Sequence, residues 1–312
     1  MGIHTVSETV MRPTVMPGAA SRAVQRTLEG PCGGARLLAV FPSAVYLAAA
    51  DGTVLALVTS DAVRLPNAVV LTTERSGSPL TCFVREGDSA ACGAGALRIG
   101  TLGVHVARWW TPRRPRPPRD RAALRAGTAG LAAAFRRGAD PRPGLPGSGR
   151  AALACLARST ADGDRAAAAA AAARLVGLGP GLTPSGDDVL SGFLLALRHL
   201  AGPAGPAGRA HAPRTATTAD EGDEADDAAW LGARIQVLAA HGTTDLSAAL
   251  LGHAARGDGC AEAVELLDAV AGNRPLAPAL TRLLTVGHTS GADLGLGVLA
   301  GARTLLDRRQ SR

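Results

Sequence analysis

Residues 109–118 read WWTPRRPRPP, and the hydrophobic pattern of the chain differs on the two sides of this stretch. The prolines of residues 111–118 remove backbone amide donors, so this segment can form neither a helix nor a central strand. Before it, short apolar runs such as Val54–Val58 alternate with turn signals such as Asp51-Gly52, which is typical of antiparallel strands. After it, apolar residues recur with the helical period to the end of the chain.

This change of period predicts an α+β protein, with a small antiparallel β domain at the N-terminus followed by a larger all-helical domain. The expected parts are a disordered tail at 1–20, a β-rich domain (a sandwich or part-barrel) at 21–110, a Pro/Arg-rich linker at 111–121 and a helical domain at 122–312. We expect a disordered insertion at 202–227, because Gly-Pro repeats are followed there by six carboxylates. The eight alanines at 166–173 predict a central helix against which others pack closely.

The composition of the chain limits the classes of partner that we expect. The chain has 312 residues, of which 46% are hydrophobic, enough to bury a substantial core. The net charge of +7 comes from 33 basic residues that are all arginine, and six of these lie between residues 108 and 121. Only 3% of residues are aromatic, so platforms for stacking bases are scarce and we expect no nucleic-acid partner.

Cysteine usage and hydropathy indicate the compartment. The five cysteines are widely spaced and form no C-x-x-C pair, which is typical of a reduced intracellular chain. No uncharged apolar run reaches the length of a membrane span, and the N-terminus lacks the apolar core of a secretory signal. We therefore expect a cytoplasmic protein without a membrane partner.

The most informative motif is GLGPGLTPSGDD at residues 177–188, which leads into an apolar helix. Glycines let a ligand approach the backbone, and exposed amides at a helix N-terminus favour an anion. No lysine follows the glycines, so this is not a Walker loop. The alternative is a capping box from Ser185 to Asp188 with no ligand, which leaves Gly179, Gly181, Thr183 and Asp187 unexplained.

A shorter copy of this motif, GHTSGAD, occupies residues 287–293. When Pro184 is omitted, the two motifs align, Asp188 with Asp293 and Gly192 with Gly297, each pair 105 residues apart. The copy adds Thr289, Ser290 and Gly291 to the candidate binding residues. A chance resemblance between two glycine-rich helix starts is the alternative.

Further polar groups lie near these motifs. Thr244 or Asp245 is predicted to cap the helix that starts there, with Thr244 also a candidate site residue. His288 is a candidate acid/base group. The spacing of Asp187, Asp188 and Asp293 matches no standard calcium or zinc motif, so we expect no metal and no other cofactor.

The sequences GLGPGLTPSGDDVLSGFLLAL, the T-x-x-S-x-x-L-x-x-A-x-x-G run from Thr244 to Gly257 and GHTSGADLGLGVLAG resemble the AllH family. That family is named for a subunit of oxamate carbamoyltransferase and was long described as a domain of unknown function. The resemblance covers about residues 30 to 307. It implies a multi-subunit enzyme of allantoin breakdown, with co-encoded partner subunits, that exchanges oxalurate plus phosphate for oxamate plus carbamoyl phosphate.

Motif and resemblance together suggest a site for a small anionic substrate. Amides of Gly179, Gly181 and Gly186 and hydroxyls of Thr183 and Ser185 can stabilise the oxyanion of carbamoyl transfer. His288 is expected to donate a proton or hydrogen bond, with Asp187 and Asp188 as further catalytic candidates that orient amines or hold loops. Two alternatives remain, a non-catalytic subunit and a stand-alone anion-binding protein.

The repeat also makes a geometric prediction. Two helix starts of the same pattern are expected to lie side by side, so that the helices from Ser185 and Ser290 point their N-termini into one pocket and their dipoles add. The polar side chains predicted to line it are those of Thr183, Ser185, Asp188, His288, Thr289, Ser290 and Asp293. The turn at Thr244-Asp245 is expected at its rim.

Overall fold

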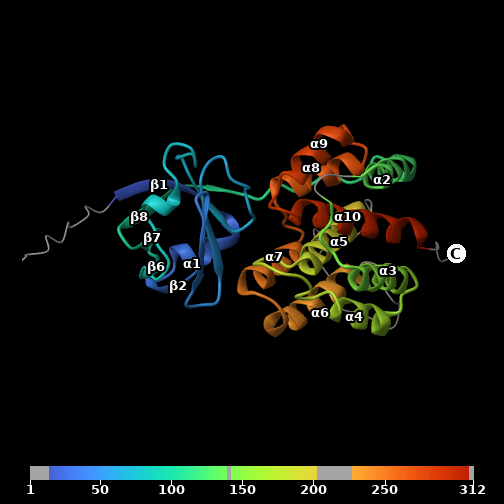
Figure 1. Ribbon diagram of the computed structural model, residues 1–312, viewed down its shortest axis with the longest axis horizontal. Helices are drawn as coiled ribbons and strands as arrows, with labels where there is room; N and C mark the ends of the chain where they lie inside the picture. Colours follow the sequence, from blue (N-terminus) through green and yellow to red (C-terminus); the bar gives the residue numbers. More distant parts are fainter. Residues whose placement is uncertain (1–13, 139–141, 202–226, 309–312) are drawn as a thin grey trace, which may run out of the picture. The chain divides into compact units, whose positions relative to one another are not determined.

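A computed structural model describes residues 14–138, 142–201 and 227–308 (Figure 1). The chain divides into two compact units, residues 1–111 and residues 112–312. Most of the predicted tail, up to residue 13, and of the predicted insertion, from 202 to 226, lies outside the described residues.

The first unit is a closed eight-stranded β-barrel. Its strands are β1 (Thr14–Ser21), β2 (Gly33–Val40), β3 (Ala44–Ala49), β4 (Val54–Val58), β5 (Ala68–Leu71), β6 (Ala90–Gly93), β7 (Ala96–Ile99) and β8 (Leu102–Trp110). They follow the order β1-β5-β4-β3-β2-β6-β7-β8 around the barrel. One turn of helix, α1 (Gln25–Glu29), and two 3-10 turns, Arg22–Val24 and Leu80–Cys82, lie between strands.

The prediction of an antiparallel β domain is wrong, although the chain is α+β. Strand β1 runs parallel to β8, and β4 runs parallel to β5, while the other pairings are antiparallel. Residues 14–20, expected in the tail, belong to β1, which joins β8 to β5 and so closes the barrel. Short apolar runs identify strands, but the direction of a partner far away in the chain is not encoded in their alternation.

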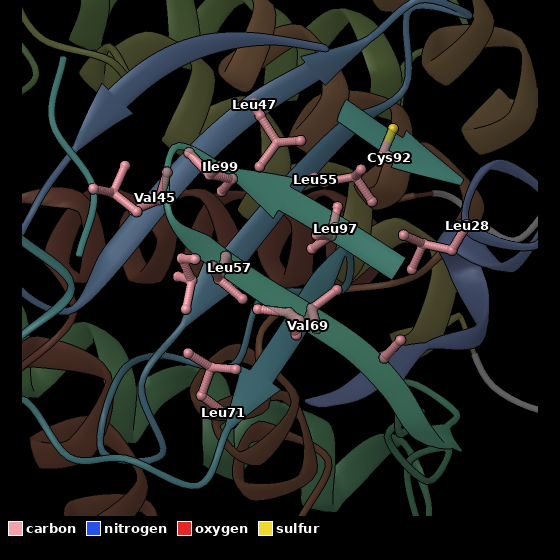
Figure 2. Packing of buried hydrophobic residues seen from close by; sticks show 14 of the residues in the cluster. Leu28, Val45, Leu47, Leu55, Leu57, Val69, Leu71, Cys92, Leu97 and Ile99 are labelled. Atoms are coloured by element: carbon pink, nitrogen blue, oxygen red, sulfur yellow. The ribbon is translucent and has the colours of Figure 1, made fainter. Parts of the chain in front are cut away.

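The barrel interior is filled by aliphatic side chains. Leu47, Leu55 and Leu57 from neighbouring strands are fully buried, and they meet Leu97 and Ile99 from the β6–β7–β8 side (Figure 2). Gly18 makes room at the closing seam, because a Cβ there would lie 2.8 Å from Val69 Cγ1 and 2.9 Å from Val104 Cγ1.

The described residues of the second unit form helices joined by loops, with no strand among them. Its helices are α2 (Arg121–Arg136), α3 (Gly147–Ala161), α4 (Arg165–Ala173), α5 (Ser185–Leu200), α6 (Asp227–Gly242), α7 (Asp245–Arg256), α8 (Ala261–Val270), α9 (Leu276–Leu284) and α10 (Ser290–Asp307). None of the helices in the described part of the chain is both long and apolar enough to cross a membrane.

The centre of this unit is α5, packed against α10 (Figure 1). Every residue of α5 except Arg198 is buried, whereas the alanine helix α4 buries only three of its residues. The prediction that the alanine run forms the central helix is therefore wrong. Alanines favour a helix anywhere, but they offer little apolar surface to bury, and the leucine-rich helix takes the centre.

Helices α5 and α10 pack at a glycine contact. A Cβ at Gly192 would lie 2.1 Å from the carbonyl oxygen of Leu294, and a Cβ at Gly297 would lie 2.0 Å from the carbonyl oxygen of Val189. Both distances are below any real Cβ contact, so the two helices can approach this closely only with glycine at both positions.

The Pro/Arg-rich stretch is held against the helical unit by Asp268 of α8. This carboxylate is fully buried, and its Oδ2 lies 2.5 Å from Arg113 Nη2 while its Oδ1 accepts a 2.8 Å hydrogen bond from the backbone amide of Arg116. Residues 111–118 contain no helix or strand, as their prolines predict, but they are fixed at these points.

Candidate functional site

The first motif forms a glycine-rich loop followed by a helix start that no side chain caps. Gly177, Gly179 and Gly181 have φ values of +71°, +119° and +94°, which other residues rarely adopt. Pro184 is the N-cap of α5 and Ser185 is its first residue, and no side-chain cap hydrogen bond is present. The capping-box interpretation of Ser185 is therefore wrong, and its hydroxyl is available for another contact.

The second motif repeats this arrangement. Gly287 has a φ of +59°, Thr289 is the N-cap of α10 without a side-chain cap bond, and Ser290 is the first helical residue. Both helix starts therefore leave a serine hydroxyl in the first turn unused for capping.

These hydroxyls are used between the two motifs. Thr183 Oγ1 lies 3.1 Å from Ser290 Oγ, which joins the loop before α5 to the start of α10. The same two hydroxyls interact with the carboxyl group of Asp188. The predicted adjacency of the two helix starts is confirmed by this contact and by the glycine contact of α5 and α10.

The carboxyl group of Asp293 has surroundings that match those of Asp188. Asp293 interacts with the hydroxyls of Ser185 and Thr289. Its Oδ1 also accepts a 3.1 Å hydrogen bond from the backbone amide of Leu145. Gly144 lies over this group, because a Cβ added there would be 2.6 Å from Ser185 Oγ and 2.9 Å from Thr289 Oγ1.

The two sets are related by an exchange of motifs. Each aspartate is accompanied by the threonine of its own motif and the serine of the other: Asp188 by Thr183 and Ser290, Asp293 by Thr289 and Ser185. The glycine contacts obey the same rule, since Gly192 meets Leu294 and Gly297 meets Val189, the residues at the equivalent positions. The sequence repeat is thus a structural repeat with approximate two-fold symmetry. We name this cluster of two aspartates and four hydroxyl side chains the paired-motif site.

Each aspartate of the site has one buried oxygen atom without a partner. Asp188 is 7% exposed and Asp293 is 0% exposed. Oδ2 of each receives no hydrogen bond from the described residues. Such a group costs about 1–3 kcal/mol when left unsatisfied, so the site has two polar atoms suited to a ligand or to a proton.

Burial raises the pKa values of Asp188 and Asp293. Loss of solvation raises the pKa of Asp188 well above its ordinary value, and the negative charges of Asp293 and Asp187 raise it further, while the hydroxyls of Ser290 and Thr183 lower it in part. Burial likewise raises the pKa of Asp293, against the hydroxyls and amides around it. A neutral carboxyl group can donate a hydrogen bond, and an ionised one can only accept.

Asp187 and Thr244 have their polar atoms engaged by the protein itself. Asp187 Oδ1 accepts a 2.8 Å hydrogen bond from the amide of Gly177, and its Oδ2 accepts from the hydroxyls of Thr243 and Ser247. Thr244 caps α7 and donates to the carbonyl of Leu182 at 2.5 Å. Both residues connect the glycine loop to the start of α7.

The remaining predicted residues divide into packing positions and an exposed rim. Gly186 and Gly291 face neighbouring backbone, because a Cβ would lie 2.0 Å from Leu175 O or 1.8 Å from Leu283 O. Gly179, Gly181 and His288 are exposed. The hydroxyl groups of Thr183, Thr289 and Ser290 are half-buried, and they lie in the two loops that form this rim or at the helix start that directly follows.

Gly144 and Leu145 also contribute to this site, although the sequence did not predict them. Their stretch, Pro143-Gly144-Leu145-Pro146, resembles any proline-containing turn and carries no polar side chain. Its contribution is a backbone amide and the absence of a side chain at residue 144, which no residue pattern reveals. As for metal ions, no group of three or more His, Cys, Asp or Glu side chains within the described ranges is arranged to hold one.

Comparison with known proteins gives one family. The model of the family described as oxamate carbamoyltransferase subunit AllH matches residues 175–302. This range contains both motifs, α5 to α9 and most of α10. Neither the curated proteins nor the solved structures give a match.

Proposed function

We propose that this chain, which matches the AllH family over residues 175–302, is a subunit of a carbamoyltransferase and binds a small oxamate-like anion at the paired-motif site. The observation that carries the proposal is the pair of buried aspartates, each with an unpartnered oxygen and two hydroxyl neighbours. The family name is that of a subunit, and the partners in this proposal are co-encoded subunits of the same enzyme.

Oxamate presents a primary amide beside a carboxylate, and the site has matching groups for both. An ionised aspartate accepts a hydrogen bond from the amide nitrogen, whereas a neutral one donates to a carboxylate oxygen. Two ionised aspartates would repel an anion. Because burial and mutual repulsion raise the pKa of Asp188 and burial raises that of Asp293, the pair favours one neutral carboxyl group, and an anion then becomes a compatible ligand.

The same groups fit the chemistry of carbamoyl transfer. In the phosphorolysis of oxalurate, a phosphate oxygen attacks the ureido carbonyl carbon, the bond from that carbon to the oxamate nitrogen breaks, and the leaving nitrogen takes up a proton. Neutral Asp188 is the proposed proton donor. The hydroxyls of Thr183 and Ser290 are the proposed donors to the oxyanion that forms before the bond breaks. His288, at the exposed rim, is the proposed contact for phosphate.

The test is calorimetric titration of oxamate into the full chain, alone and assembled with its co-encoded subunits. In the oxamate complex, where no oxyanion forms, the same two hydroxyls are the proposed donors to the carboxylate of oxamate. Thr183→Ala/Ser290→Ala is therefore expected to weaken oxamate binding about tenfold or more, since two hydrogen bonds at about 0.5–1.5 kcal/mol each are lost. The matched control is Thr72→Ala/Ser76→Ala, which removes the same two groups from exposed positions of the barrel unit.

The alternative, a subunit without a catalytic role, makes a different prediction. If both motifs serve only architecture or subunit contacts, the Thr183/Ser290 variant assembles less well but oxamate affinity per assembled complex is unchanged. Unchanged affinity together with unchanged carbamoyl transfer in the assembled enzyme contradicts the proposal.

A further inference from the structure

A second feature of the helical unit lies outside the paired-motif site. A cleft of about 710 Å³ opens between α2, α3, α10 and the loop residues 142–143. The charged side chains among its described lining residues are Arg136, Arg142, Arg150, Arg158, Arg303 and Asp307. The lining therefore has five positive charges and one negative charge.

The charge of this cleft is not neutralised within the described part of the chain. Arg150 donates from Nε to the carbonyl of Leu145, which leaves its charge uncompensated. For Arg136, Arg142, Arg158 and Arg303, the described residues provide no ion pair. Arginine stays charged at any physiological pH. Like charges gathered around one concavity repel each other, and a ligand with several negative charges removes this repulsion.

The floor of the cleft is apolar. Phe135, Leu153, Leu296 and Leu299 contribute to it from α2, α3 and α10. An inorganic ion would fill little of this volume and would leave the apolar side chains uncovered. Volumes of 300–1,000 Å³ with an apolar lining and a few polar groups are typical of sites for small organic molecules.

We propose that this cleft binds a phosphorylated small molecule with an apolar or aromatic body, of the size of a nucleotide. Guanidinium groups bind phosphate oxygens in bidentate geometry, and the apolar floor contacts the body. A nucleic acid fits less well, since the cleft is a single concavity, and Phe135 is the one aromatic side chain among its described lining residues. The cleft is distinct from the paired-motif site, although Pro143 in its lining directly precedes Gly144 beside Asp293.

The experiment is calorimetric titration of the full chain with ATP, and with triphosphate and adenosine as partial probes. ATP is expected to bind more tightly than either partial probe, and raising the salt concentration from about 50 to 500 mM is expected to weaken it, because the charges are screened. The double substitution Arg158→Glu/Arg303→Glu is expected to weaken ATP binding at least about tenfold.

The matched control is Arg125→Glu/Arg234→Glu, which changes the net charge equally at exposed helix positions outside the cleft. We expect a change below about twofold in the control. Circular dichroism checks that both variants fold, and Arg158→Gln/Arg303→Gln serves if the charge reversal does not. No saturable binding of ATP, equal losses in both double variants, or tighter binding of a short oligodeoxynucleotide than of ATP would overturn the proposal. None of these outcomes bears on oxamate binding.

Discussion

Asp187 and Asp188 are neighbours of the same residue type with opposite environments. Both oxygens of Asp187 accept hydrogen bonds from the protein, whereas Oδ2 of Asp188 has no partner among the described residues. The hydrogen bonds that Asp187 accepts stabilise the fold, whereas burial disfavours the charged form of Asp188 and raises its pKa. The sequence around these two neighbours does not predict this difference, because Asp187 depends on Thr243 and Ser247, whereas Asp188 depends on residues of α10.

This contrast gives a prediction about pH. A carboxyl group whose pKa is raised in the folded state binds its proton more tightly there, so stability falls as pH rises from the unfolded pKa, about 4, through the folded pKa. Asp188→Asn removes that loss, and its melting temperature is expected to exceed that of the wild type at pH 8, with the difference vanishing near pH 4. Thermal unfolding followed by circular dichroism at both pH values measures it.

Asp187→Asn is the control for this measurement. It weakens hydrogen bonds to Gly177, Thr243 and Ser247 and is expected to cost about 1–3 kcal/mol at pH 8. If Asp188→Asn is destabilised at pH 8 to the same extent as Asp187→Asn, the unpartnered oxygen does not carry the cost that we assign to it.

At the scale of helices, the sequence repeat determines how α5 and α10 pack. The alignment of Gly192 with Gly297 is visible in the sequence, and the structure shows why both are glycine: each Cα lies against the backbone of the other helix. What the sequence could not reveal is the exchange of serines between the motifs. Ser185-x-x-Asp188 is equally compatible with a capping box, and only the position of the second helix decides between the two interpretations.

The glycine contact predicts a large effect of a single methyl group. Gly192→Ala places a Cβ 2.1 Å from a carbonyl oxygen of α10, so the helices must separate, and we expect a loss of about 3 kcal/mol or more of unfolding free energy. Chemical denaturation measures this loss.

The control for this prediction is Gly252→Ala in α7, where the nearest heavy atom outside the local backbone is Arg256 Nη1 at 3.5 Å. There we expect a gain of about 0.5–1 kcal/mol, because alanine favours a helix and a Cβ at this position makes only an ordinary van der Waals contact. Equal losses at both positions would mean that the helix contact is softer than these distances indicate.

At the scale of the whole molecule, the change of period around residues 109–118 predicts a change in the character of the chain, and the chain divides into its two compact units between residues 111 and 112. Closure of the barrel was not predictable in the same way. Strand β1 contains Pro17 and Gly18 and lacks a clear alternation, and it becomes a strand because β8 and β5 both need a partner along their edges. That requirement arises from the assembled sheet and not from the local residues.

The junction of the two units supplies the last prediction. Asp268 is buried and holds Arg113 by its side chain and Arg116 by its backbone amide, although the guanidinium groups themselves are largely exposed. Asp268→Ala is expected to cost about 1–3 kcal/mol, and to release residues 112–118 from α8. Subtilisin should then cut the variant there several-fold faster than the wild type, which mass spectrometry of the two fragments detects.

Asp258→Ala is the control, because it removes only a 3.6 Å pair with Arg114, and it should leave the cleavage rate nearly unchanged. Equal rates for the wild type and Asp268→Ala would show that the prolines alone keep this stretch extended and protected, without an anchor on α8.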